Sequence, residues 1–131
     1  MKGVLFAYLA TLAVLAVLDG VWLGYLARDF YAREIASIAA DPVRWLPAAI
    51  FYFAYPMGLI ILALQPLPTS IATAMGRAGL VGLVAYGTYD LTNMATLQAW
   101  SWRLALVDTA WGTVLSAAMG AAAFVVLRRM L

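Results

Sequence analysis

Four long stretches of nearly unbroken apolar residues constrain this chain more than any other feature of its sequence. A hydrocarbon core about 30 Å thick is crossed by roughly 20 apolar residues of α-helix. The apolar stretches predict helices at residues of about 3–27, 46–64, 77–97 and 104–127. The predicted fold class is therefore an all-α integral membrane protein, a four-transmembrane-helix bundle that forms a single multi-pass domain over residues 1–131.

The composition agrees with a location in the lipid bilayer and excludes several classes of function. Of the 131 residues, 66% are hydrophobic and only 11% are charged, which is far from the composition of soluble domains. The chain has no cysteine and no histidine, so disulfides, thiolate or imidazole metal sites, and nucleophiles that depend on either residue are excluded. The small net charge of +2 does not indicate a nucleic-acid partner. The expected partner is the lipid bilayer, and the cofactor remains unknown.

The connection between the first two predicted helices has a pattern of its own. In RDFYAREIASIAADPVRWLP, residues 28–47, the side chains of Tyr31, Ile35 and Ile38 share one helical face. Such a face favours a short helix lying in the membrane interface. An ordinary polar loop fits the same residues equally well.

The basic residues bear on orientation. Four spans place both termini on one side of the membrane, and the eight basic residues divide equally between the two sides: Lys2, Arg77, Arg128 and Arg129 on one, and Arg28, Arg33, Arg44 and Arg103 on the other. The positive-inside rule is thus nearly balanced. The free amino group and the paired C-terminal arginines favour cytoplasmic termini.

Three aspartates lie inside predicted spans, where an acidic residue costs roughly 2.5–3.5 kcal/mol on insertion scales. Measured from the end marked by Trp45, Trp100 and Trp102 at 1.5 Å per residue, Asp19 lies about 12 Å deep, Asp90 about 10 Å and Asp108 about 6 Å. All three are therefore expected in the same leaflet at similar height.

Helical phase places these carboxylates in the bundle interior. Tyr86, Asp90 and Asn93 follow one another at i, i+4 and i+7, and Asp108 begins a row of small residues that favours close helix packing. The predicted ligand-binding layer consists of Asp19, Trp22, Tyr52, Tyr55, Tyr86, Tyr89, Asp90, Asn93, Asp108 and Trp111. No lysine or arginine is expected at this depth, so a carboxylate should carry a proton or bind a cation. The competing interpretation is that these polar residues only hold the helices together through hydrogen bonds.

Three segments carry a resemblance to a known family. These are DGVWLG at residues 19–24, YGTYDLTNMATL at 86–97 and DTAWGT at 108–113. In this order and in these spans they resemble the bacterial membrane family called domain of unknown function 2177, over nearly the whole chain. The resemblance implies a small four-helix protein of the bacterial inner (plasma) membrane with no assigned activity. It gives signature status to Asp19, Trp22, Tyr89, Asp90, Asn93, Asp108 and Trp111.

Three hypotheses for function remain open at this point. The first is binding of an amphiphilic or cationic small ligand, either alone or as part of transport, and transport would favour a homo-oligomer. The second is an intramembrane enzyme that modifies a lipid or isoprenoid. The third is an accessory subunit of a larger membrane complex. Because the three aspartates lie on separate helices rather than in one metal-binding motif, no metal site is predicted and binding ranks above catalysis.

Overall fold

The protein is entirely helical, as the sequence predicts. The computed structural model describes all 131 residues and contains no strand. Its elements in chain order are α1 (Lys2–Val21), the π-helical turn η1 (Trp22–Leu26), α2 (Arg28–Glu34), α3 (Trp45–Ala63), α4 (Ile71–Thr96) and α5 (Trp102–Arg129).

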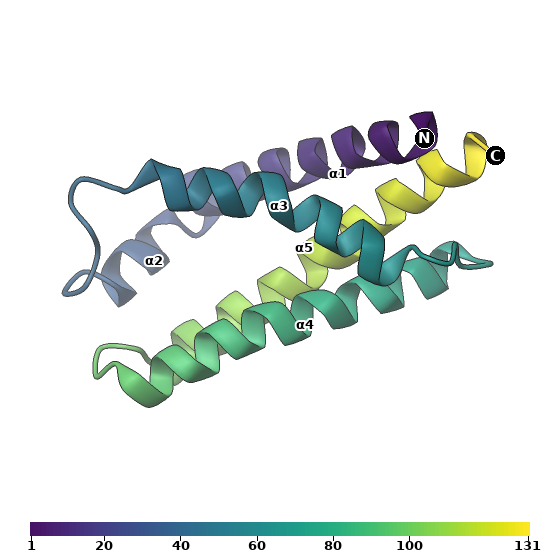
Figure 1. Cartoon of the computed structure of the whole chain (residues 1–131). Helices are drawn as coiled ribbons and strands as arrows, with labels where there is room; N and C mark the ends of the chain where they lie inside the picture. Colours follow the sequence, from purple (N-terminus) through teal and green to yellow (C-terminus); the bar gives the residue numbers. More distant parts are fainter.

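The four long helices run alternately up and down. Both termini therefore lie at one end of the molecule, and α2 lies at the other, which we call the α2 end (Figure 1). The termini are in contact, since a Cβ on Gly3 would lie 3.3 Å from the Cβ of Met130. Helix α5 is central, because it packs extensively against α1 and α4, whereas α3 packs more loosely on its neighbours.

Length and composition qualify three segments as candidate membrane spans. These are Lys2–Leu26, Trp45–Ala63 and Trp102–Arg129. Helix α4 has 26 residues, long enough to cross a bilayer, but it falls outside that set. Helix α4 is less apolar than its neighbours because it carries polar residues, including Asp90, Thr92 and Asn93.

The helix ends follow local chemistry. Ser70 and Ser101 cap α4 and α5, each accepting a hydrogen bond from a backbone N–H three residues later, at 3.1 and 3.0 Å. The predicted start of the third helix at residue 77 is thus wrong by six residues, because hydropathy falls off at Arg77 while the capped helix begins at Ile71. The predicted fourth helix, 104–127, extends to 102–129: the Ser101 cap sets its start, and its last turn carries Arg128 and Arg129.

The predicted first helix, 3–27, is not uniform. Regular α-helix ends at Val21, and one wide turn follows in which the Ala27 N–H donates to the Trp22 carbonyl, five residues back, at 2.7 Å. π-Helical turns of this kind are rare and occur often at functional sites. The chain then enters α2, so the connection contains a helix rather than only a loop.

Helices α4 and α5 approach each other through glycines. A Cβ on Gly82 would lie 2.4 Å from the backbone carbonyl oxygen of Gly112, and one on Gly120 would lie 2.4 Å from the Cβ of Ala78. A Cβ on Gly112 would enter the ring of Tyr86. The row of small residues that starts at Asp108 therefore faces α4, which turns Asp108 toward the bundle.

The apolar core fills the half of the bundle nearer the termini. Its fully buried members include Leu15, Leu59, Leu115 and Met119. Toward the α2 end, α3 and α4 splay apart (Figure 1). Polar and aromatic side chains occupy that half instead.

A prediction tests the glycine contact. Gly82→Ala should lower the free energy of unfolding by about 1–3 kcal/mol, because the new methyl group meets a backbone carbonyl that cannot rotate away. The measurement is thermal unfolding in detergent. Gly76→Ala is the matched control on the same helix, since its Cβ would meet nothing within 4 Å. Equal stability of the two variants would contradict the close packing of α4 on α5.

Candidate functional site

Asp19 is the point at which three helices are tied together. Its side chain, only 6% exposed, is carried by the last turns of α1. One carboxylate oxygen accepts a hydrogen bond from the indole N–H of Trp111 on α5 at 3.0 Å, and the other accepts one from the hydroxyl of Tyr52 on α3. Both donors are neutral, so the hydrogen bonds stabilise a carboxylate without cancelling its charge.

A second chain of contacts joins η1, α2 and α5. The ring of Trp22 stacks on Trp111 with centroids 4.5 Å apart and planes 10° from parallel. The Trp22 indole N–H donates to the Tyr31 hydroxyl at 3.2 Å, and that hydroxyl donates to Asp108 Oδ1 at 2.7 Å. The connecting helix α2 is thus attached to the bundle through Tyr31.

The environment of Tyr31 keeps its hydroxyl protonated. Burial away from water raises the pKa of Tyr31 well above its usual value, and the hydrogen bond to Asp108 raises it further, against an opposing effect of Trp22. The phenol is therefore a neutral donor at physiological pH. It supplies a hydrogen bond to Asp108 and no positive charge.

Asp90 is the most completely buried of the three aspartates. It is fully buried, and its Oδ2 accepts a hydrogen bond from the Thr109 hydroxyl at 3.2 Å. Its other oxygen, Oδ1, has no hydrogen-bond partner. The carboxyl of Asp108, on the residue next to Thr109, is a close neighbour, and so is the indole of Trp100.

A cavity of about 510 Å³ opens at the α2 end of the bundle, within the usual size range of small-molecule sites. Five helical elements line it, namely α1, η1, α3, α4 and α5, with α3 and α4 forming two of the walls. Its lining residues are Asp19, Leu23, Pro47, Ala48, Phe51, Tyr52, Ala85, Tyr86, Tyr89, Asp108 and Trp111. Two carboxylates and five aromatic rings thus face one space, and no lysine or arginine does.

The predicted layer divides into three parts in the structure. Six of its residues line the cavity: Asp19, Tyr52, Tyr86, Tyr89, Asp108 and Trp111. Two support it from behind, since Trp22 stacks on Trp111 and the Tyr55 hydroxyl lies 2.6 Å from Ser116 Oγ. Asp90 and the half-buried Asn93 lie outside the cavity, toward the end of α4.

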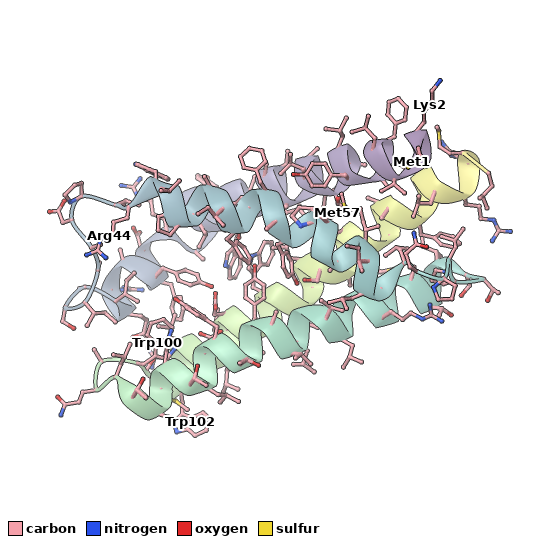
Figure 2. The ribbon with its side chains drawn as sticks, viewed as in Figure 1. Met1, Lys2, Arg44, Met57, Trp100 and Trp102 are labelled. Atoms are coloured by element: carbon pink, nitrogen blue, oxygen red, sulfur yellow. The ribbon has the colours of Figure 1, made fainter.

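Tyr31 and Phe51 are residues of the site that the sequence-based reasoning did not select. The signal for Tyr31 is the face it shares with Ile35 and Ile38, which was assigned to the membrane interface. Trp100 is another such residue. Of the three tryptophans expected at this end, Trp102 points away from the helices, as an interfacial residue does, whereas Trp100 is half-buried near the end of the α4–α5 hairpin (Figure 2).

The fold and the apolar helices define an all-helical membrane protein. The model of the family described as "Predicted membrane protein (DUF2177)" matches residues 4–125, so the chain belongs to this family, and the resemblance seen in the sequence is confirmed. Comparison with curated proteins and with solved structures finds no match.

The contacts of Tyr31 give a second prediction. Tyr31→Phe removes the donor to Asp108 and the acceptor for Trp22, so α2 should open about tenfold or more often, because leaving buried polar groups unpaired costs about 1–3 kcal/mol. Hydrogen–deuterium exchange of the backbone amides of residues 28–34 measures this opening. Tyr25→Phe, at a side chain that is 80% exposed, is the control. Unchanged exchange in both variants would show that Tyr31 does not hold α2.

Proposed function

We propose that this protein binds an amphiphilic organic cation in the cavity at the α2 end, with the charged group beside Asp19 and Asp108. The observation that carries the proposal is the lining of the cavity, which combines two carboxylates with aromatic rings and contains no basic residue. All eight lysine and arginine side chains of the chain are exposed. The negative charge of the cavity is therefore left for a ligand to neutralise.

The aromatic lining favours an organic cation over a hydrated metal ion. The faces of tyrosine, tryptophan and phenylalanine rings attract ammonium groups, and the attraction increases where water is excluded. Phe51, Tyr86 and Trp111 supply such rings on three different helices. In addition, no group of three or more acidic side chains is arranged to hold a metal ion.

The walls of the cavity suggest a route from the lipid. Phe51 on α3 is 40% exposed and Tyr89 on α4 is 55% exposed, and both line the cavity. The splay between these helices at the α2 end would let an apolar tail extend into the surrounding leaflet while the charged group stays inside (Figure 1). An amphiphilic ligand satisfies both environments.

We assign ligand binding to this cavity, rather than transport of the ligand across the membrane through a single copy of the protein. The half of the bundle nearer the termini is filled by fully buried apolar side chains, including Leu15, Leu59 and Leu115. Movement of a ligand to the other leaflet would need a rearrangement of that core, or an assembly of several copies in which two chains share a path.

We also propose that α4 crosses the membrane as a fourth span, in the bacterial inner membrane with both termini cytoplasmic. Its 26 residues are long enough, and its polar residues Asp90 and Tyr86 turn inward, buried and half-buried respectively. Thr92 and Thr96 on its exposed side donate their hydroxyl groups to their own helix backbone, which lowers the cost of facing lipid.

The absence of cysteine makes this topology directly testable. Gln65→Cys and Gln98→Cys introduce single thiols at exposed positions on either side of α4. A membrane-impermeant maleimide added to intact bacterial cells should label the second and not the first. Labelling of Gln65→Cys alone would reverse the orientation but keep the fourth span. Equal labelling of both would show that α4 does not cross.

A binding measurement tests the proposed ligand class. Octyltrimethylammonium is a suitable probe, because its charge is permanent and its chain is apolar. The purified protein should retain one molecule in native mass spectrometry, and Asp108→Asn should weaken binding about tenfold or more, since a charge facing the cavity is lost. Asp41→Asn, in the exposed connection before α3, is the control.

Neutral octan-1-ol separates charge recognition from simple apolar burial. It should bind the wild type much more weakly than the cation and should be insensitive to Asp108→Asn. If the two probes bind equally, or if the Asn variant retains the cation, the carboxylates do not recognise a cation and the proposed function is wrong.

A further inference from the structure

We propose that Asp90 and Asp108 together hold one proton while the cavity is empty, and that an organic cation binding beside Asp108 displaces this proton. The first half concerns the two carboxyl groups alone. The second half rests on the proposed function, and it makes the cavity a site of exchange between a cation and a proton.

The geometry of the pair is the first step. Thr109 donates to Asp90 Oδ2 at 3.2 Å, which brings α5 to the Asp90 side chain and places the neighbouring Asp108 carboxyl beside it. The two groups differ in access. Asp90 is fully buried and lies outside the cavity lining, whereas Asp108 is half-buried and lines the cavity.

The partners of the pair are the second step. Asp108 Oδ1 accepts from Tyr31, and Asp90 Oδ2 accepts from Thr109. Asp90 Oδ1 and Trp100 Nε1 are the two buried side-chain polar atoms of the protein without a partner, and the Trp100 indole lies near Asp90. The Trp100 indole N–H is a neutral donor, so a hydrogen bond from it to Oδ1 would add no positive charge.

The charge around the pair is the third step. The ionisable groups around it come from three elements: Tyr31 of α2, Tyr86 and Tyr89 of α4 and, across the cavity, Asp19 of α1. None of them is basic, and the basic residue nearest in sequence, Arg103, is exposed. Two neighbouring carboxylates in such surroundings repel each other and are poorly solvated, so one shared proton is the stable state. The proton belongs to the pair rather than to either residue.

The exchange then balances in charge. With the cavity empty, the pair carries one proton and one negative charge. When a cation binds at Asp108, it supplies the positive charge that the proton supplied before. The proton leaves through the cavity to water, and the total charge of the site is unchanged. Binding of each cation should therefore release one proton.

Carbodiimide labelling tests the shared proton without any ligand. Dicyclohexylcarbodiimide reacts with protonated carboxyl groups in apolar surroundings. At neutral pH the wild type should gain a single label on Asp90 or Asp108, located by peptide mass spectrometry, and labelling should fall as pH rises. Asp90→Asn, which keeps the side-chain shape, should abolish it. Asp29→Asn, at an exposed position in α2, should not change it.

Proton release tests the exchange. Octyltrimethylammonium added to the weakly buffered wild type should release one proton for each molecule bound, as read by a pH indicator. Its affinity should rise roughly tenfold per pH unit while the pair is protonated and level off above that range, because proton and cation compete. Asp90→Asn should still bind the cation, with no proton release and with an affinity independent of pH.

The outcomes separate this proposal from the proposed function. An unlabelled wild type at neutral pH overturns the shared proton. A labelled wild type that binds the cation without releasing a proton overturns the exchange. If the wild type is labelled but does not bind the cation, the proposed function and the exchange are wrong, and the proton pair stands. Thermal unfolding of each variant shows whether a lost signal reflects loss of folding.

Discussion

The paired hydrogen bonds onto Asp19 are the interaction on which the rest of the site depends. Trp111 of α5 and Tyr52 of α3 donate to one carboxyl group of α1, so three helices meet at one acidic side chain. The position of Trp111 then fixes Trp22 by stacking, and Trp22 in turn binds Tyr31. Removing the carboxylate would leave two buried donors unpaired and would loosen each of these contacts. The architecture of the α2 end is therefore built around the side chain of Asp19.

The glycine contacts of α4 with α5 explain why there is room for a cavity. Gly82 and Gly112 let the two backbones approach so closely that a methyl group would not fit between them. Helix α3 has no comparable contact and carries bulky rings, including Phe51 and Tyr52, toward the α2 end. One tight pair and one loose helix leave a space between α3 and α4, and the apolar core closes that space at the other end.

The sequence predicts what periodicity and depth can determine. It predicts the helical class, the inward direction of Asp108 through its row of small residues, and six of the residues that line the cavity. It does not predict the partner of Asp108, because Tyr31 reaches it across 77 positions of sequence from a helix whose face looked suited to the membrane interface. It also misplaces the start of α4, since a serine cap sets that start and hydropathy does not register it. The hydrophobic pattern of the sequence carries no information about helix caps or about contacts between segments that are distant in sequence.

The polar residues of the bundle are of two kinds, and the difference bears on whether they only join helices. The Tyr55 hydroxyl with Ser116, and the Tyr8 hydroxyl with the Phe53 carbonyl, are neutral pairs in which every group has a partner. Such pairs hold helices together without further consequence. The aspartates are different, because the donors that reach them are all neutral, Asp90 Oδ1 has no donor, and the basic residues all remain at the surface. A chain that needed only helix contacts could have used asparagine at these depths with less cost. Three aspartates without a basic partner therefore support the proposal that these positions serve a positively charged species.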